Sequence, residues 1–319
     1  MRKRVTLPIA DEGDNVTLIR QASNQRLLDA YQSATNDFAV VTRGFQENDS
    51  QQWHIDAIGG VGTLQQVHTG RYLDAYETDH DHSVVTRPAQ NNDSQKWVLI
   101  PTGIQGAYTI QQLSTARYLY AHESESDDYS AVTRSAQYSD GKHHLSQVWH
   151  LTTFSDGGFA FKQLSTGSTG GTGGPTSRYL DAYQSAAHDF SAVTRLHQGD
   201  ESQLWNFEPV GGVYTLRQDS TERYLDAYAD NQRDYGVVTR ESKRRPWNNA
   251  PSQCWIILDD RIRQASTGRN LDAYQAEDTD YRVVTRPSQG NPTQSWTFDQ
   301  APPPPRLEAV IAAGRGDRP

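Results

Sequence analysis

Residues 71–76 read Arg-Tyr-Leu-Asp-Ala-Tyr, and versions of this stretch recur six times along the chain of 319 residues. A polar gap follows, closing in most copies on Asp and an aromatic residue, and then come Val-Thr-Arg and Gln-x-Trp. The leading arginines are 45, 46, 61, 45 and 46 residues apart, at Arg26, Arg71, Arg117, Arg178, Arg223 and Arg269. Such a period indicates repeated supersecondary units that share a core with their neighbours.

Apolar and polar residues alternate within each repeat, which is typical of half-buried strands and not of helices. In the second repeat, Leu73 and Ala75 fall on one face of a strand, and Asp74 falls on the other. Turn-rich stretches divide this repeat into strands predicted at 62–67, 71–76, 83–87 and 95–100. Glycine pairs predict hairpins between consecutive repeats at Gly59-Gly60, Gly157-Gly158 and Gly211-Gly212. The predicted fold class is therefore all-β.

Composition and charge exclude several classes of function. A formal net charge of -9 and a pI near 5.5 provide no extended basic field, so nucleic acid and anionic membranes are not expected as main partners. Cys254 is the sole cysteine, which excludes an intrachain disulfide and a thiolate metal cluster. Asp79-His80-Asp81-His82 carries metal-ligand residues, but adjacent residues on a turn rarely converge on one ion. No catalytic motif is present, and we expect neither a cofactor, a metal nor an enzymatic activity.

The sequence also carries an expectation about location. Residues 1–14 contain no apolar stretch of signal-peptide length, and no segment approaches the roughly 18 apolar residues of a spanning helix. We expect synthesis in the cytoplasm without a signal peptide, no membrane insertion, and release, if it occurs, by a leaderless route.

The Gln-x-Trp pairs have a structural interpretation. Residues two apart share a strand face, so the glutamine amide can bond backbone groups of the preceding loop while the indole fills the core. The pairs are Gln51/Trp53, Gln95/Trp97, Gln147/Trp149, Gln203/Trp205, Gln253/Trp255 and Gln294/Trp296.

Six Gln-x-Trp repeats of about 46 residues, each with four strands, resemble the ricin-type (ricin B-like) β-trefoil lectins. The resemblance implies two tandem trefoils, at 1–154 (repeats 1–3) and 155–300 (repeats 4–6), followed by a Pro-rich tail at 301–319. It also implies sugar binding in shallow pockets, up to one per repeat, without catalysis. A six-bladed propeller is the alternative architecture, and the Gln-x-Trp signature and the very short third strand argue against it.

The resemblance also implies site residues. In that family an Asp in the second strand accepts hydrogen bonds from sugar hydroxyls, and this position corresponds to Asp29, Asp74, Asp181, Asp226 and Asp272. The family's aromatic position in the third strand holds Val here. Tyrosines two residues beyond each aspartate are the replacement rings, at Tyr31, Tyr76, Tyr183, Tyr228 and Tyr274. Arginines that end the third strand are candidate donors, at Arg43, Arg87, Arg195, Arg240 and Arg286.

An alternative interpretation is that Asp and Arg merely pair across the two strands and lock each repeat. The third repeat has Tyr120 and His122 where the others have Asp and Tyr, yet it keeps Arg134. A buried pair that lost one partner would leave a charge uncompensated at about 3–5 kcal/mol, so we expect the carboxylates to be exposed. Glu123 or Asp127 is a possible substitute carboxylate in this repeat.

The sequence thus predicts a non-catalytic, multivalent carbohydrate-binding protein with glycans or glycoconjugates as partners. The alternative is the receptor-binding or targeting component of a defence toxin that recognises a protein surface. In that case the variable loops would carry specificity, at 167–177 and at 243–249 with Trp247. A carbohydrate-active enzyme is a third hypothesis. It is disfavoured because the repeats leave no residues to build a catalytic domain.

Overall fold

The structure is a computed structural model that describes residues 16–139, 142–153, 159–166, 177–242 and 251–299, together with Ile311. Strands and short 3₁₀ turns make up the regular structure of the ranges within 16–299, which confirms the all-β class. In the second repeat the second, third and fourth strands lie within one residue of their predicted positions. No helix among these residues is long and apolar enough to cross a bilayer.

The strands are β1 (Val16–Gln21), β2 (Leu27–Ala30), β3 (Val40–Arg43), β4 (Gln52–Gln66), β5 (Tyr72–Ala75), β6 (Val84–Arg87), β7 (Lys96–Pro101), β8 (Ala107–Gln112), β9 (Tyr118–Ala121), β10 (Ala131–Arg134), β11 (Tyr138–Ser139), β12 (Lys142–His143), β13 (Val148–Thr153), β14 (Phe159–Gln163), β15 (Arg178–Ala182), β16 (Ala192–Leu196), β17 (Trp205–Gln218), β18 (Tyr224–Ala227), β19 (Val237–Arg240), β20 (Trp255–Leu258), β21 (Arg261–Gln264), β22 (Asn270–Ala273), β23 (Val283–Arg286) and β24 (Trp296–Phe298).

Short 3₁₀ turns lie in the loops that flank the third strands. They are η1 (Ala34–Asn36), η2 (Asp49–Gln51), η3 (His80–His82), η4 (Asp93–Gln95), η5 (Glu125–Asp127), η6 (Leu145–Gln147), η7 (Ala186–His188), η8 (Glu201–Gln203), η9 (Pro251–Gln253), η10 (Glu277–Thr279) and η11 (Pro292–Gln294).

The Gln-x-Trp pairs have the architecture that the sequence predicted. Each of the six indoles is buried in a core and donates from Nε1 to a leucine carbonyl of the second strand, as Trp97 does to Leu73 at 2.9 Å. Gln95 accepts from the Gln90 amide at 2.7 Å and donates to the Pro88 carbonyl at 2.9 Å, which closes the loop before the fourth strand.

Two separate cores define two lobes, and the repeats are divided between them in an unexpected way. One core gathers apolar residues from 64 to 207, so it belongs to repeats 2, 3 and 4. The other joins residues 19–55 to residues 214–296, so it belongs to repeats 1, 5 and 6. The predicted division at residues 154 and 155 is therefore wrong. One trefoil, the 2/3/4 lobe, is inserted between the first and fifth repeats of the other, the 1/5/6 lobe.

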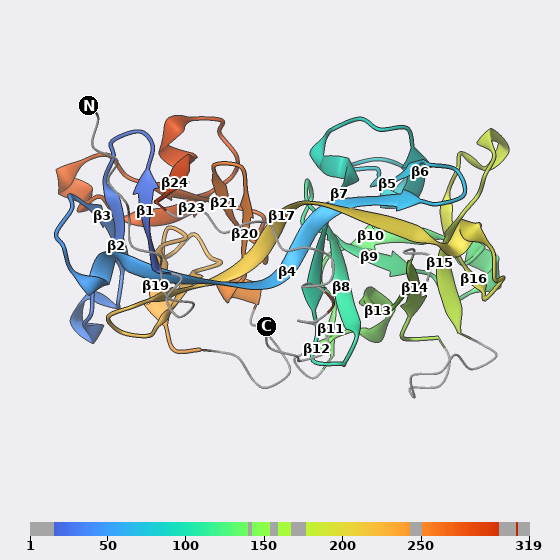
Figure 1. Ribbon diagram of the computed structural model, residues 1–319, viewed down its shortest axis with the longest axis horizontal. Helices are drawn as coiled ribbons and strands as arrows, with labels where there is room; N and C mark the ends of the chain where they lie inside the picture. Colours follow the sequence, from blue (N-terminus) through green and yellow to red (C-terminus); the bar gives the residue numbers. More distant parts are fainter. Residues whose placement is uncertain are drawn as a thin grey trace, which may run out of the picture.

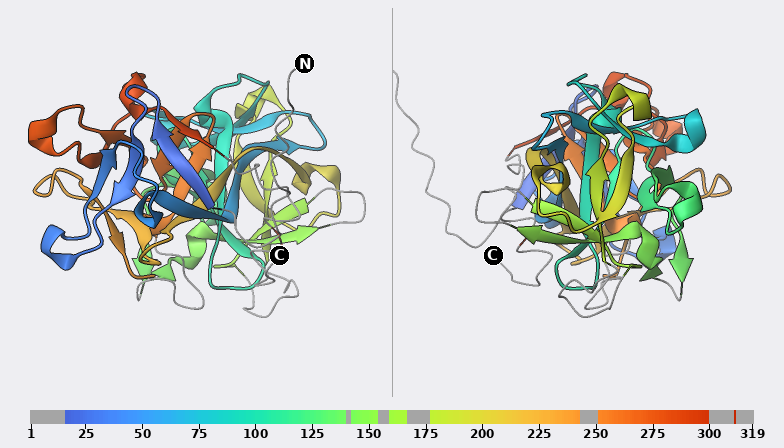
Figure 2. Two further views of the ribbon diagram at one scale, coloured as in Figure 1. Left: turned by 60° about the vertical axis from the view of Figure 1, so that its left-hand side comes forward. Right: turned by 90° about the vertical axis from the view of Figure 1, so that its right-hand side faces the viewer.

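The cause is a ribbon of two long antiparallel strands that runs through both lobes (Figure 1). β4 pairs with β17 from Trp53 opposite Gln218 to Gln66 opposite Trp205. The fourth strand of repeat 1 therefore continues straight into the first strand of repeat 2 and does not fold back on it. The left view of Figure 2 shows β4 and β17 from another side, and the right view looks along the long axis with one lobe in front of the other.

Glycines in the ribbon permit close contacts, not the hairpins that the sequence predicted. A Cβ at Gly59 would lie 2.4 Å from the Leu99 carbonyl oxygen, and one at Gly62 would lie 2.4 Å from that of Glu208. A Cβ at Gly211 would lie 2.8 Å from the Ile257 carbonyl oxygen. The predicted hairpin at 157–158 lies outside the described residues.

A third apolar cluster covers the place where the lobes meet. It combines Val61 and Val98 of the 2/3/4 lobe with Val213, Cys254 and Ile256 of the 1/5/6 lobe. Cys254 is completely buried there. In the C-terminal tail the structure describes only Ile311, which packs against the core of the 2/3/4 lobe and accepts a hydrogen bond from the Tyr108 hydroxyl at 3.2 Å.

The nested arrangement predicts which strands can be joined covalently. Arg20 of β1 is directly opposite Thr297 of β24, so a protein with Arg20→Cys and Thr297→Cys should form an intrachain disulfide. The expected product is a monomer with no free introduced thiol, detected by thiol labelling and mass spectrometry, in a Cys254→Ala background.

The matched control is Arg20→Cys with His150→Cys, because His150 occupies in repeat 3 the place of Thr297 in repeat 6. Consecutive packing of repeats 1–3 would bring Arg20 opposite His150. Cross-linking of the control pair without cross-linking of the first pair would contradict the nested fold.

Candidate functional site

The second and third strands of each repeat form a hairpin, and the three hairpins of a lobe contact one another. Isolated backbone bridges join them, such as Val85 to Ser191 and Ala39 to Val238. The strand tyrosines that the sequence singled out bond residues of a neighbouring repeat at these contacts. We call each set of contacting side chains, such as Tyr76 and Arg87 of repeat 2 with Asp189 of repeat 4, a junction cluster.

The core of each junction is a two-residue turn in the left-handed backbone region. The turn consists of an aspartate, the turn aspartate, followed by the turn aromatic residue, with φ between 48° and 56° at both positions in all six repeats. The pairs are Asp37/Phe38, Asp81/His82, Asp128/Tyr129, Asp189/Phe190, Asp234/Tyr235 and Asp280/Tyr281. Non-glycine residues are uncommon in this region, and a pair of them requires outside support.

The neighbouring repeat supplies that support through its leading arginine. The Arg71 guanidinium lies 3.6 Å from the centroid of the Phe190 ring, and four other junctions have the same stack at 3.2–3.7 Å. The Nη2 of Arg71 also donates to the Thr86 carbonyl at 2.7 Å, and the equivalent bond occurs in every repeat at 2.5–3.1 Å. The leading arginine is thus a structural residue.

The strand tyrosines make the second contact across each junction. The Tyr76 hydroxyl donates to the Asp189 carboxylate at 3.0 Å, and the five such bonds span 2.6–3.0 Å. The tyrosine rings are half-buried, and most of the turn aspartates are exposed. The bonds are Tyr31 to Asp280, Tyr76 to Asp189, Tyr183 to Asp128, Tyr228 to Asp37 and Tyr274 to Asp234.

The strand aspartates are buried, which contradicts the expectation that their carboxylates face outward. Asp74, Asp181 and Asp226 have no exposed surface. Asp29 is 3% exposed and Asp272 is 7% exposed. Arginine side chains of the facing strand and the loop before Gln-x-Trp cover them. Burial raises the pKa of the Asp181 carboxyl, although Arg195 and hydrogen bonds from Ala182 and Ser202 oppose this shift.

The strand arginines pair with these aspartates from the outside. In four pairs a nitrogen and an oxygen lie 3.5–3.8 Å apart: Arg43–Asp29, Arg87–Asp74, Arg195–Asp181 and Arg240–Asp226. In repeat 6 the arrangement differs, because Arg286 binds Asp234 of the neighbouring repeat at 2.9 Å and Gln294 donates to Asp272 at 3.1 Å. The cross-strand lock that the sequence left open is therefore present in four repeats.

Each guanidinium also lies near the strand tyrosine of its own repeat. Arg87 is 4.3 Å from the centroid of the Tyr76 ring, and its side chain is 27% exposed. The partly exposed surface of a complete junction cluster thus consists of a tyrosine ring, a guanidinium and the carboxylate of the turn aspartate. The buried strand aspartate lies beneath and orients the arginine.

The third repeat shows why an arginine can be kept without a strand aspartate even though the aspartates of the other repeats are buried. Its Arg134 side chain is 33% exposed and lies 4.0 Å from Asp81 of the neighbouring turn, so the charge is not stranded without a strand aspartate. Burial is unequal within the pairs, because the carboxylate is covered whereas the guanidinium reaches solvent. Asp127, which the sequence suggested as a substitute for the missing strand aspartate, lies 3.7 Å from His122.

The turn aspartates are the functional candidates that sequence reasoning missed. The signal was available, because Asp followed by an aromatic residue recurs in the repeated stretch. What the sequence did not show is that this carboxylate lies across a repeat boundary from the tyrosine it contacts. No group of three or more metal-ligating residues suited to an ion occurs within the described ranges, including 79–82.

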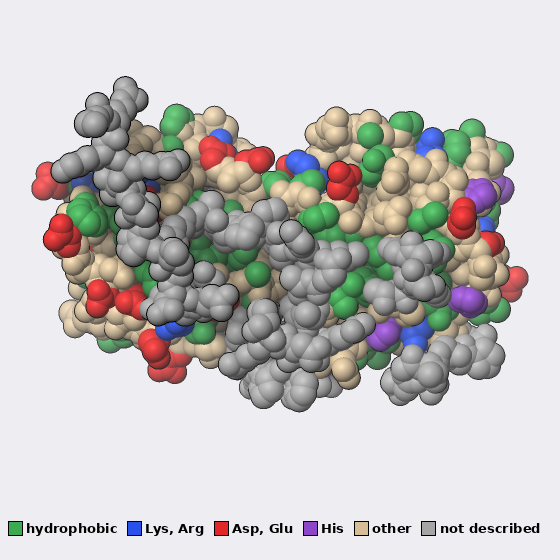
Figure 3. All heavy atoms as spheres, in the orientation of Figure 1, with side chains coloured by type: hydrophobic (Ala, Val, Ile, Leu, Met, Phe, Trp, Pro, Cys, Tyr) green, Lys and Arg blue, Asp and Glu red, His purple; other side chains and the backbone are tan. Residues whose placement is uncertain are grey.

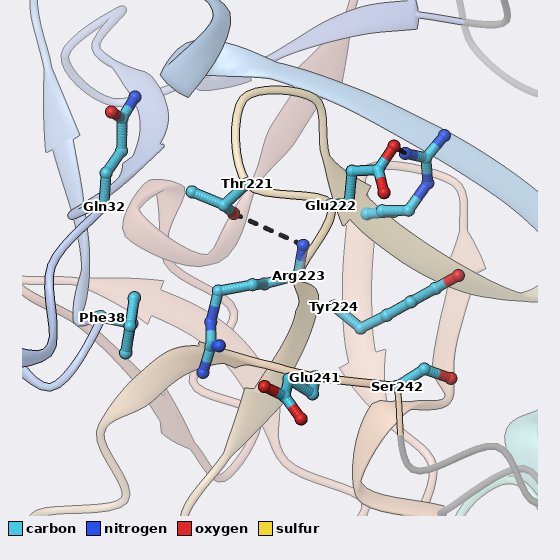
Figure 4. A pocket seen from close by; sticks show the side chains of 9 residues that line it. Gln32, Phe38, Thr221, Glu222, Arg223, Tyr224, Glu241 and Ser242 are labelled. Carbon is cyan, nitrogen blue, oxygen red and sulfur yellow. Dashed lines mark hydrogen bonds and ion pairs between the residues drawn. The ribbon is translucent and has the colours of Figure 1, made fainter.

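A shallow pocket lies beside the junction of repeats 1 and 5. Figure 4 shows the Arg223 guanidinium between Phe38 and Glu241. Arg223 already bonds the Thr239 carbonyl, and Arg217 pairs with Glu222 at 3.5 Å, so the pocket offers a ligand little uncommitted positive charge. The lining residues are Gln32, Phe38, Arg217, Thr221, Glu222, Arg223, Tyr224, Glu241 and Ser242.

Comparison with known proteins agrees with the fold. The model of the ricin-type beta-trefoil lectin domain-like family matches residues 6–91 and 201–280, and the chain belongs to this family. Among curated proteins, none matches the sequence significantly.

Solved structures with a similar fold include the Rhizoctonia solani agglutinin (20% identity, 47% of this chain, 95% of that chain, TM-score 0.36). Another is the ricin B-like lectin of Macrolepiota procera in complex with lactose (18% identity, 48% of this chain, 96% of that chain, TM-score 0.35). A mosquitocidal holotoxin is similar over more of the chain (14% identity, 93% of this chain, 42% of that chain, TM-score 0.37).

The contacts across the junctions predict a measurable loss of stability. Changing Tyr31, Tyr228 and Tyr274 to Phe removes three hydroxyl-to-carboxylate bonds of the 1/5/6 lobe and keeps the rings. The free energy of unfolding should fall by about 1–3 kcal/mol, because a bond to a charged carboxylate contributes about 1.5–3 kcal/mol when buried and less than about 1 kcal/mol when exposed. Denaturant unfolding measures the difference.

The control changes Tyr72, Tyr179 and Tyr224 to Phe, since these half-buried tyrosines make no hydroxyl bond to any described residue. Their triple variant should unfold like the wild type. Equal effects of the two triple variants would show that the bonds across the junctions contribute nothing specific.

Proposed function

We propose that this protein is a non-catalytic, multivalent carbohydrate-binding protein whose ligands bind at the junction clusters. The observation that carries the proposal is the grouping of a tyrosine ring, a guanidinium and a carboxylate at five of the six junctions. Membership of a lectin domain family supports the same function.

The chemistry of a cluster suits a hydroxylated ligand. A turn aspartate such as Asp280 can accept hydrogen bonds from neighbouring hydroxyls, and a strand arginine such as Arg43 can donate to a ring or hydroxyl oxygen. The Tyr31 ring provides an apolar face for the C–H side of a sugar. In this arrangement the strand aspartate, here Asp29, positions the arginine and does not touch the ligand.

Charge supports a neutral or weakly polar ligand. The face in Figure 3 carries Lys and Arg side chains singly among Asp and Glu, and the whole chain has a formal charge of -9. Such a surface favours glycans over polyanions. A single shallow site is weak, near -4 kcal/mol at millimolar affinity, so several clusters that engage one glycan-bearing surface raise the overall affinity.

The alternative of a toxin component that recognises a protein surface gains no specific support. The loops that would carry its specificity, at 167–177 and 243–249 with Trp247, lie outside the described residues except for Ser177. It remains the second hypothesis, and the experiment on the clusters separates the two.

A glycan array tests the proposal. The wild type should bind at least one class of saccharide, and changing Tyr31, Tyr228 and Tyr274 to Ala should lower the signal from the 1/5/6 lobe about tenfold, the value of one lost ring contact near 1.4 kcal/mol. The signal from the 1/5/6 lobe is isolated by making this comparison in a background with Tyr76→Ala and Tyr183→Ala. The reference protein carries only these two changes, and the test protein carries the three others as well.

The matched control replaces Tyr72, Tyr179 and Tyr224 by Ala in the same background, and thermal melting confirms that both proteins fold. Undiminished saccharide binding after loss of the junction tyrosines would move the site elsewhere. Absence of binding to every saccharide would favour the protein-surface alternative.

A further inference from the structure

One position of the junction cluster varies while the others repeat. It is the residue immediately before the turn aspartate, which we call the cap residue. It lies at the hairpin tip, and in most repeats it is exposed. The cap residues in chain order are Asn36, His80, Asp127, His188, Arg233 and Thr279.

In repeats 2, 4 and 5 the cap residue lies against the strand tyrosine of its own repeat. The His188 ring stacks on Tyr183 with 4.1 Å between centroids and 16° between planes. The His80 ring is 4.3 Å from Tyr76, tilted by 43°. The Arg233 guanidinium lies 4.2 Å from the Tyr228 centroid.

The same three rings also carry the strand arginine. Arg87, Arg195 and Arg240 each lie 4.3 Å from the centroid of their tyrosine. A ring has two faces, and a planar group stacked at about 4 Å covers one of them. Two such groups against one ring leave a ligand less of its surface, so we regard the tyrosines of repeats 2, 4 and 5 as covered.

Repeats 1 and 6 differ, because the side chain of the cap residue turns to its own hairpin. Asn36 Nδ2 donates to Ser33 Oγ at 3.5 Å, and Thr279 Oγ1 donates to the Ala276 carbonyl at 2.7 Å. Neither side chain carries an aromatic ring or a guanidinium that could stack on a tyrosine.

The arginines of repeats 1 and 6 also lie farther from the rings than in the capped repeats. Arg43 is 4.7 Å from the Tyr31 centroid, and Arg282 and Arg286 are 5.6 and 5.5 Å from that of Tyr274. Among the described residues, no aromatic or imidazole ring stacks on Tyr31 or Tyr274.

The third repeat has no strand tyrosine to cap. His122 replaces the tyrosine, and the cap residue Asp127 contacts it at 3.7 Å. Arg134 lies 3.4 Å from the other imidazole nitrogen. This cluster therefore lacks the strand tyrosine that the other five share.

We propose that the cap residue decides which junction clusters bind sugar, so that the clusters built on Tyr31 and Tyr274 are open and those of repeats 2, 4 and 5 are closed. This inference rests on the proposed function and specifies which sites perform it. Both open clusters belong to the 1/5/6 lobe. A ligand that must displace a stacked cap should bind a closed cluster about tenfold more weakly than an open one.

Exchange of the cap residues tests the inference site by site. His188→Asn should open the cluster of Tyr183, and Asn36→His should close that of Tyr31. The full-length proteins carry ¹³C-labelled tyrosine, and ring signals are followed by NMR during titration with free D-galactose, D-mannose, N-acetyl-D-glucosamine and the saccharide strongest on the array.

In the wild type the Tyr31 and Tyr274 signals should shift and that of Tyr183 should not. In His188→Asn the Tyr183 signal should join them, with at least about a tenfold gain in affinity at that site. In Asn36→His the Tyr31 response should be lost while Tyr274 keeps its own. Because the caps lie at exposed hairpin tips, the unperturbed spectrum confirms that each variant folds.

The controls move the same side chains by one residue, as Ala187→Asn and Thr35→His, and should behave like the wild type. Equal responses of all five strand tyrosines, or responses that ignore the cap exchange, would overturn the inference and leave sugar binding intact. No tyrosine response to any saccharide would overturn the proposed function as well.

Discussion

The left-handed turn between the second and third strands is the constraint on which both lobes depend. Two consecutive non-glycine residues hold φ near 50° in every repeat, and residues in such regions cost of order 1–3 kcal/mol each unless their surroundings fix them. These surroundings belong to a neighbouring repeat of the same lobe. For the turn of repeat 4, repeat 2 stacks Arg71 on Phe190 and bonds Tyr76 to Asp189. A single repeat therefore cannot stabilise its own turn.

These contacts form a ring in each lobe. In the 1/5/6 lobe, repeat 1 bonds the turn of repeat 6, repeat 6 bonds that of repeat 5, and repeat 5 bonds that of repeat 1. In the 2/3/4 lobe two tyrosine bonds exist, and Arg134 near Asp81 takes the place of the third. Because the proposed ligand groups lie at the contacts between repeats, the assembled lobe is what creates a site.

The sequence predicted the strands and contacts within one repeat. It did not predict which repeats pack together, because the repeats are nearly alike. Alternation placed the strands around Leu73 within one residue. The Gln95 amide bonds the preceding loop and the Trp97 indole fills the core, as predicted. The pairing of β4 with β17 could not be predicted, because every fourth strand is complementary to every first strand. The sequence correctly placed Asp74 on the strand face opposite Leu73, but it did not predict that Asp74 is buried, with Arg87 lying over it.

A crystal structure with bound saccharide tests most directly the claim that the junction cluster is both a structural contact and a ligand site. The sugar ring should lie over Tyr31 or Tyr274, with hydroxyls on Asp280 or Asp234 and the strand aspartates still covered. Density for the sugar on Asp29 or Asp74 with the strand arginine displaced, or in the pocket beside Arg217, would contradict it.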